Sequence, residues 1–277
     1  MLPLWEKLAE LEEKELLEHW GDEYRRFMET RGGFMPKFAS CPGRLLAVLM
    51  VFLFAYILLY GFRMLYVSTY TRDFLFRVTA FLSLSLIAVG LVMKVFEVES
   101  RLGLVRKNFP SAFLLASAVS LPSPLFQLNS MKNGLPSLIP GAHLPLIFLS
   151  YFLFALCSFS VYMAFSLDAL RSCGRLWFAV PPLFLLLYDS YFLNSARLPP
   201  IGDVILFAVL YPVVYRKTGN SLGLVVSYML VAEWDVWWAF GAVFGLAALK
   251  TATLIRVGVS LGATVFLIIR WALTRRV

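Results

Sequence analysis

Residues 144–167 read LPLIFLSYFLFALCSFSVYMAFSL, a run without a single charged side chain. As one α-helix, this run would be roughly 36 Å long at about 1.5 Å per residue, and the hydrocarbon core of a bilayer is about 30 Å thick. A helix that is apolar on all sides lies either in a membrane or in the core of a large protein. The stretch therefore predicts a membrane-spanning helix.

The rest of the chain shares this apolar character. Of its 277 residues, 60% are hydrophobic and 15% are charged, and the mean hydropathy is +0.77. Soluble domains contain about 45–50% apolar and about 25% charged residues. The composition therefore excludes an ordinary soluble enzyme, a disordered chain and a disulfide-stapled secreted domain. The predicted fold class is all-α, a polytopic integral membrane helix bundle with the lipid bilayer as its surroundings.

Apolar runs alternate with short charged segments after residue 44 and predict about eight transmembrane helices. We place them near residues 45–62, 74–96, 109–127, 144–167, 176–194, 201–215, 221–249 and 251–270. Most of the 25 lysines and arginines fall in segments on one side of this layout, which predicts cytoplasmic N- and C-termini in the cell membrane. The net charge of +8 is explained by this topology, so nucleic acid is not an expected partner.

Residues 1–44 differ from residues 45–277, the transmembrane helical domain. Acidic and basic side chains alternate here with apolar ones near helical spacing, which predicts a cytosolic amphipathic helix. Within residues 12–36, the stretches EEKEL (12–16) and GDEY (21–24), followed by Phe27 and Pro36, resemble the C-terminal tail of isoprenylcysteine and phospholipid methyltransferases.

In those methyltransferases a glutamate of the tail helps to hold S-adenosylmethionine, and the resemblance implies that role for Glu12 or Glu13. The segment opens this chain, however, whereas it closes the chain in that family. The remainder of that cofactor site has no counterpart in this sequence. The favoured interpretation is therefore a helix on the membrane surface, and no cofactor is expected.

Ionisable residues inside the predicted spans are candidates for function, because burying a charge near the bilayer centre costs at least about 2.5–3.5 kcal/mol. Asp189 lies about twelve residues into the fifth predicted span, roughly 18 Å from its start and near the midplane. Glu233 and Asp235 lie in the seventh span, and Arg256 in the last is a plausible counter-ion for either. These acids predict an ion pathway in a small-solute or proton-coupled transporter; the alternative is a buried structural pair.

Glu233 and Asp235 are two positions apart, and this spacing limits how they can share a site. Positions i and i+2 of a helix point about 200° apart, so Glu233 and Asp235 serve one site only if the helix breaks between them. The run 221–249 is also too long for one span, which favours a tilted or discontinuous helix.

Residues 215–220 (YRKTGN), followed by an apolar helix, are similar to the last motif region of the CAAX prenyl protease and bacteriocin-processing family. The resemblance places Tyr228 at the family's histidine and Ala232 at its asparagine. Residues 97–101 (EVESR) are a distorted counterpart of the family's paired glutamates. The resemblance thus implies a catalytically silent relative of a membrane peptidase.

Cys157 in the fourth span and Arg197, which follows residues 194–196 (NSA), resemble the cysteine and arginine of the exosortase and archaeosortase family. That resemblance implies a transpeptidase with Cys157 as nucleophile, Arg197 as its partner and Arg256 as a third group. A thiolate needs a nearby cation or base, and the alternative is a cysteine that serves only in packing. The three cysteines contain no CxxC pair, so no metal site is predicted. A divergent or silent membrane peptidase relative is the leading prediction, and transport is the alternative.

Overall fold

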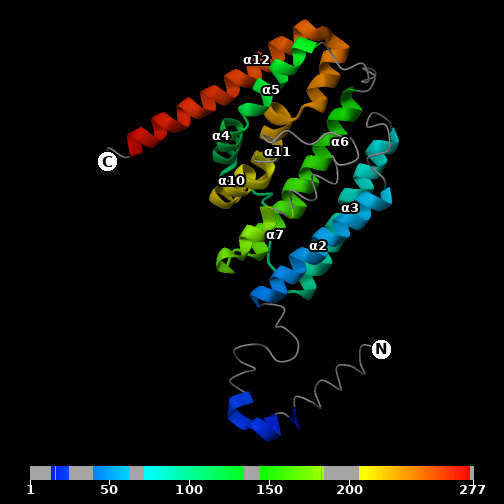
Figure 1. Ribbon diagram of the computed structural model, residues 1–277, viewed down its shortest axis with the longest axis vertical. Coiled ribbons are helices and arrows are strands. Elements are labelled where there is room, and N and C mark those ends of the chain that lie inside the picture. Colours follow the sequence, from blue (N-terminus) through cyan, green and yellow to red (C-terminus); the bar gives the residue numbers. More distant parts are fainter. Residues whose placement is uncertain are drawn as a thin grey trace.

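The computed structural model describes residues 14–24 without 16, 40–62, 72–133, 144–183 without 182, and 206–274. Every regular element in these ranges is a helix, so the all-α prediction is confirmed for them. Figure 1 shows α2 (Cys41–Phe62), α3 (Arg72–Val95) and α6 (Leu144–Leu156) running side by side. Helix α12 (Asp235–Thr274) packs along α4 (Phe109–Val119) and α5 (Pro122–Ser130).

Four helices within the described residues are long and apolar enough to cross a membrane: Cys41–Leu59, Leu75–Val95, Leu144–Ala169 and Asp235–Thr274. The count is five if α4 and α5, which bend by 43° at Ser120 and Leu121, form one broken span. Pro122 and Pro124 explain this bend, because proline lacks the N–H that would continue the helical ladder. These long apolar helices are compatible with the predicted membrane protein.

The prediction of eight spans is not supported. In the predicted fifth span, residues Gly174–Ala179 form the short 3₁₀-helix η5, and most of the remainder lies outside the described residues. In place of the sixth, a π-helical turn η7 (Leu206–Leu210) leads into α10 (Tyr211–Thr218), and neither is long enough to cross a bilayer.

The boundary predicted between the last two spans, at Lys250, is wrong. Helix α11 (Ser221–Ser227) and the π-helical turn η8 (Tyr228–Ala232) end at a break at Glu233 and Trp234, and α12 then continues through Lys250. The sharp turn lies instead at Gly245, with φ 88° and ψ 164°, where α12 changes direction near the top of Figure 1. Only glycine adopts this conformation readily, because it has no Cβ.

Residues 17–24 form a helical segment whose side chains are mostly exposed, including Trp20 at 57%. Figure 1 places this segment apart from the bundle. Its amphipathic role at a cytosolic membrane surface therefore stays a prediction, and Glu12 and Glu13 lie outside the described residues.

A disulfide between Cys41 and Cys173 joins the start of α2 to the loop that follows α7 (Phe165–Ala169), with a Cα–Cα distance of 5.4 Å. Beside it, the Arg44 guanidinium donates a hydrogen bond to Ser172 Oγ at 2.8 Å. The sequence did not predict this pairing. The two cysteines are separated by 132 residues, so only the packing of α2 beside α7 brings them together.

Candidate functional site

The break in the helix at Glu233 and Trp234 is held by a buried cluster of polar groups. Arg256, from the part of α12 beyond Gly245, is 3% exposed. Its guanidinium donates to the carbonyl oxygens of Val231 and Glu233 and to Gln127 Oε1 of α5. It also lies 4.9 Å from the centre of the Trp237 ring. A broken helix frees carbonyl groups that must find new donors inside a membrane, and Arg256 supplies them.

Two of the three acids of the predicted ion pathway, Glu233 and Asp235, belong to this cluster. Glu233 Oε1 accepts the backbone N–H of Asp235 at 3.0 Å, so it caps the start of α12, and Glu233 also interacts electrostatically with Arg256. The Asp235 carboxylate accepts a hydrogen bond from the Tyr151 hydroxyl of α6. The helix breaks at Glu233 and Trp234, which is the condition under which Glu233 and Asp235 can serve one site. These contacts are those of a buried structural network, and Asp189 lies outside the described residues, so the ion pathway stays a prediction.

Cys157 lies in another environment. It begins the π-helical segment η4 (Cys157–Ala164), its side chain is fully buried, and its neighbours include Ser85, which shares a hydrogen bond with Tyr162. The described hydrogen bonds of Arg256 go instead to α5, to η8 and to Glu233 in the break before α12. Arg197 lies outside the described residues. The catalytic set of Cys157, Arg197 and Arg256 therefore stays a prediction.

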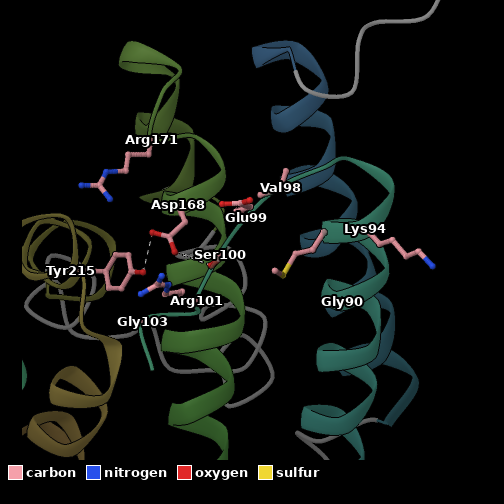
Figure 2. A pocket seen from close by; sticks show the side chains of 12 residues that line it. Gly90, Lys94, Val98, Glu99, Ser100, Arg101, Gly103, Asp168, Arg171 and Tyr215 are labelled. Atoms are coloured by element: carbon pink, nitrogen blue, oxygen red, sulfur yellow. Dashed lines mark hydrogen bonds between the residues drawn. The ribbon is translucent and has the colours of Figure 1, made fainter. Parts of the chain in front are cut away.

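A second site, a polar pocket of about 640 Å³, lies where the segment after α3 meets the turn between α10 and α11 (Figure 2). These two segments include residues from the stretches 97–101 and 215–220, which the sequence singled out. The pocket is lined by Gly90, Met93, Lys94, Val98, Glu99, Ser100, Arg101, Gly103, Asp168, Arg171, Tyr215 and Gly219. A second cavity of about 520 Å³ shares five of these residues, namely Arg101, Asp168, Arg171, Tyr215 and Gly219.

At the centre of the polar pocket, three side chains from different helices and loops form one network. The Asp168 carboxylate of α7 accepts hydrogen bonds from Ser100 Oγ at 2.8 Å and from the Tyr215 hydroxyl of α10 at 3.0 Å. Figure 2 shows Asp168 facing Tyr215, with Arg101 and Arg171 on either side of the carboxylate. Tyr215 is 3% exposed, and all three side chains of the network line the pocket.

The loop of residues 96–108 is fixed against α11 by backbone contacts. Asn220 is fully buried; its Oδ1 accepts the N–H of Gly223 at 2.7 Å and caps α11, while its Nδ2 donates to the Lys107 carbonyl at 3.0 Å. The Ser221 N–H and Oγ donate to the carbonyls of Gly103 and Leu102 at 3.0 and 2.7 Å. The walls of the pocket are thus tied together at the turn that the sequence singled out.

The same loop has an unusual backbone. Among the described residues, the non-glycine residues with positive φ are Glu97, Leu102 and Asn108, at 51°, 53° and 64°. All three lie in this loop. Such conformations are uncommon outside glycine and persist only where surrounding contacts impose them, often at functional sites.

Cations outnumber carboxylates around the two cavities. Lys107, Arg216 and Lys217 join Arg101 and Arg171, against Glu99 and Asp168. Arg216 stacks on Trp177 at 4.2 Å. Within the part of the chain that the structure describes, the side chains of Arg101, Lys107 and Lys217 have no hydrogen-bond or ion-pair partner in the protein. Lys94 points away from Asp168 in Figure 2.

Sequence reasoning assigned these cations to membrane topology alone and did not single out Asp168. The available signal was an acid directly after a long apolar run, followed three residues later by Arg171.

In the described residues no three His, Cys, Asp or Glu side chains are grouped as a metal site. Compared with known proteins, the chain matches no family model, no curated protein and no solved structure.

Proposed function

We propose that this chain is an integral membrane protein that binds a ligand in its polar pocket without hydrolysing it, and that it is a divergent relative of the CAAX-type membrane peptidases. One observation carries the proposal. The segments 97–101 and 215–220, far apart in the sequence, line one pocket together with Asp168. Tyr228 and Ala232, the positions that the resemblance assigns to the family's histidine and asparagine, do not line this pocket, so the pocket supports a ligand site and the kinship rests on the motif resemblance.

The residues at the positions of the family's catalytic groups support a binding role. Tyr228, at the histidine position, packs edge-to-face against Phe159 with ring centres 5.4 Å apart. Ala232, at the asparagine position, has no polar side chain and its carbonyl accepts a hydrogen bond from Ser123 Oγ. A phenol and a methyl group thus stand where the resemblance places an imidazole and an amide, so the side chains of those two motif positions are missing here.

The test is a cleavage assay with the full-length protein in non-ionic detergent. A farnesylated CAAX peptide is incubated with the protein and the products are followed by mass spectrometry, with Glu99→Gln as the matched variant. We expect no cleavage by either protein. Cleavage by the wild type that Glu99→Gln abolishes would refute the binding-only proposal. Cleavage of a transpeptidase substrate that Cys157→Ser abolishes would favour the exosortase-like alternative instead.

A second candidate function is transport, and the broken helix at Glu233 favours it, because discontinuous membrane helices often form substrate and ion sites. Reconstituted liposomes with a pH-sensitive dye test this candidate. Proton uptake that Glu233→Gln abolishes, while Glu99→Gln leaves it intact, would assign transport to the broken helix. Absence of uptake in the wild type removes this candidate.

For the orientation, we propose that the end carrying the polar pocket faces the cytoplasm, because cations gather at cytoplasmic ends of membrane helices. The Cys41–Cys173 disulfide lies near this end, where Arg44 and Arg171 also lie. Disulfides persist in oxidising compartments and in the cytosol of hyperthermophiles. The opposite orientation would place this disulfide in an oxidising compartment, and labelling of a cysteine introduced at Lys107 in intact cells distinguishes the two orientations. Labelling by a membrane-impermeant reagent would show that the pocket end lies outside the cytoplasm and would refute the proposed orientation.

A further inference from the structure

We infer that the polar pocket binds a phosphate ester that carries a free hydroxyl group, with the phosphate held by Arg101 and Arg171 and the hydroxyl by Asp168. This inference rests on the proposal that this pocket is the ligand site, and it names the chemical class of the ligand. Two sources share this chemistry, a soluble polyol phosphate and the head group of a lipid such as phosphatidylglycerol.

The phosphate part of the inference comes from the arginines. Figure 2 shows Arg101 and Arg171 on either side of the central network, and both side chains are exposed to the cavity. Guanidinium groups bind phosphate oxygens through two parallel hydrogen bonds. Arg101 has no protein partner in the described part of the chain, so its donors remain available.

The second cavity adds charge without adding carboxylates of its own. Lys107, Arg216 and Lys217 line it, and Asp168 is its one acidic residue. A cleft lined mostly by one sign of charge concentrates ions of the opposite sign. The field around the two neighbouring cavities therefore favours an anion over a neutral or cationic ligand.

The hydroxyl part of the inference comes from Asp168. An ionised carboxylate offers about four acceptor positions, and the Ser100 and Tyr215 hydroxyls occupy two of them. The remaining positions repel a bare phosphate but accept a hydroxyl. A carboxylate placed between two arginines thus recognises a molecule with a phosphate at one end and a donor group beside it, rather than an inorganic ion.

The size of the site agrees with this class of ligand. The cavities measure about 640 and 520 Å³ and share five lining residues, and small-molecule sites in proteins span about 300–1,000 Å³. The space is therefore sufficient for a phosphorylated polyol or a lipid head group.

The experiment measures binding to the full-length protein in non-ionic detergent by isothermal titration. The probes are sn-glycerol 3-phosphate and inorganic phosphate, and a parallel arm compares nanodiscs of phosphatidylcholine with and without phosphatidylglycerol. We expect Arg101→Gln to weaken binding of the preferred probe by about ten- to a hundredfold, the range for a hydrogen bond to a charged group. The matched control Arg270→Gln changes an exposed arginine of α12 outside the pocket and should leave binding unchanged.

Asp168→Asn tests whether Asp168 selects the ligand, because a purely structural role of Asp168 would leave the preference between the two probes unchanged. The amide loses the negative charge, so affinity for inorganic phosphate should rise while the preference for sn-glycerol 3-phosphate over inorganic phosphate falls several-fold. Saturable binding of the soluble ester identifies a soluble source, and binding that requires phosphatidylglycerol identifies the lipid.

Absence of binding in both arms, or equal effects of Arg101→Gln and Arg270→Gln, would overturn the inference. Peptide cleavage in the earlier assay would instead refute the proposed function, whatever the phosphate result. The two failures are therefore distinguishable.

Discussion

Substitution of Gly103 by alanine should separate the two walls of the polar pocket. Gly103 has φ +64°, and a Cβ added to it would lie 2.6 Å from Tyr215 Cε2 and 2.7 Å from the backbone nitrogen of Ser221. A left-handed conformation costs a residue with a Cβ about 1–2 kcal/mol, and overpacking at a tight contact costs about 1–3 kcal/mol. We therefore expect Gly103→Ala to lower the free energy of unfolding by about 2–5 kcal/mol.

Gly219 offers a matched control within the same pocket. Its φ is +65°, but nothing lies within 4 Å of an added Cβ. Gly219→Ala therefore carries the backbone strain without the steric contact, and it should lower the free energy of unfolding by only about 1–2 kcal/mol. The difference between the two variants isolates the close approach of Gly103 to Tyr215 and Ser221.

The assay is thermal unfolding of the detergent-solubilised protein, followed by intrinsic tryptophan fluorescence. One kcal/mol shifts Tm by about 2–4 °C in a protein of roughly this size. Gly103→Ala should thus lower Tm by roughly 4–20 °C and Gly219→Ala by roughly 2–8 °C. Equal shifts for the two variants would refute the contact between the loop of residues 96–108 and the α10–α11 turn.

Arg256→Met should destabilise the protein by about 3–5 kcal/mol, because it leaves the carbonyls of Val231 and Glu233 without donors. Arg256→Lys should recover only part of that loss in a denaturant titration, since an ammonium lacks the guanidinium fork, and full recovery would contradict the geometry. Cys41→Ser should destabilise by up to about 4–5 kcal/mol, the loop-closure value for cysteines 132 residues apart. Dithiothreitol should lower the Tm of the wild type to the same value and leave the variant unchanged. Gly223→Ala should destabilise by about 1–3 kcal/mol, because the new Cβ would lie 2.7 Å from Ala112 Cβ of α4. Gly258→Ala in α12, with open space around it, is the control, and a Tm shift as large as that of Gly223→Ala would argue against the close α4–α11 contact.

Much of the fold is predictable from the sequence, because the length and hydropathy of a helix are local properties. The helices Cys41–Leu59, Leu75–Val95 and Leu144–Ala169 lie close to the predicted spans 45–62, 74–96 and 144–167. Breaks are harder to place. The sequence required a discontinuity between Glu233 and Asp235 for a shared site, but it did not indicate that the helix turns at Gly245, where φ is 88°, rather than at Lys250.

The candidate site was accessible to sequence reasoning only in pieces. The segments 97–101 and 215–220 and residues Glu233, Asp235 and Arg256 stood out through motif resemblance or through charge inside an apolar run. The sequence did not indicate how far apart these residues lie in space, because a single sequence contains no information about separations between residues far apart in the chain.

The sequence by itself determined the class of this protein: apolar helices, a charged N-terminal segment and cations gathered between the spans. Hydropathy is a sum over neighbouring residues, so it needs no tertiary contact. Only the tertiary structure decided that Asp168 meets Ser100 and Tyr215, that Cys41 meets Cys173 and that Arg256 holds the broken helix. Each of these contacts joins residues from separate segments, and the packing of helices alone sets their distance.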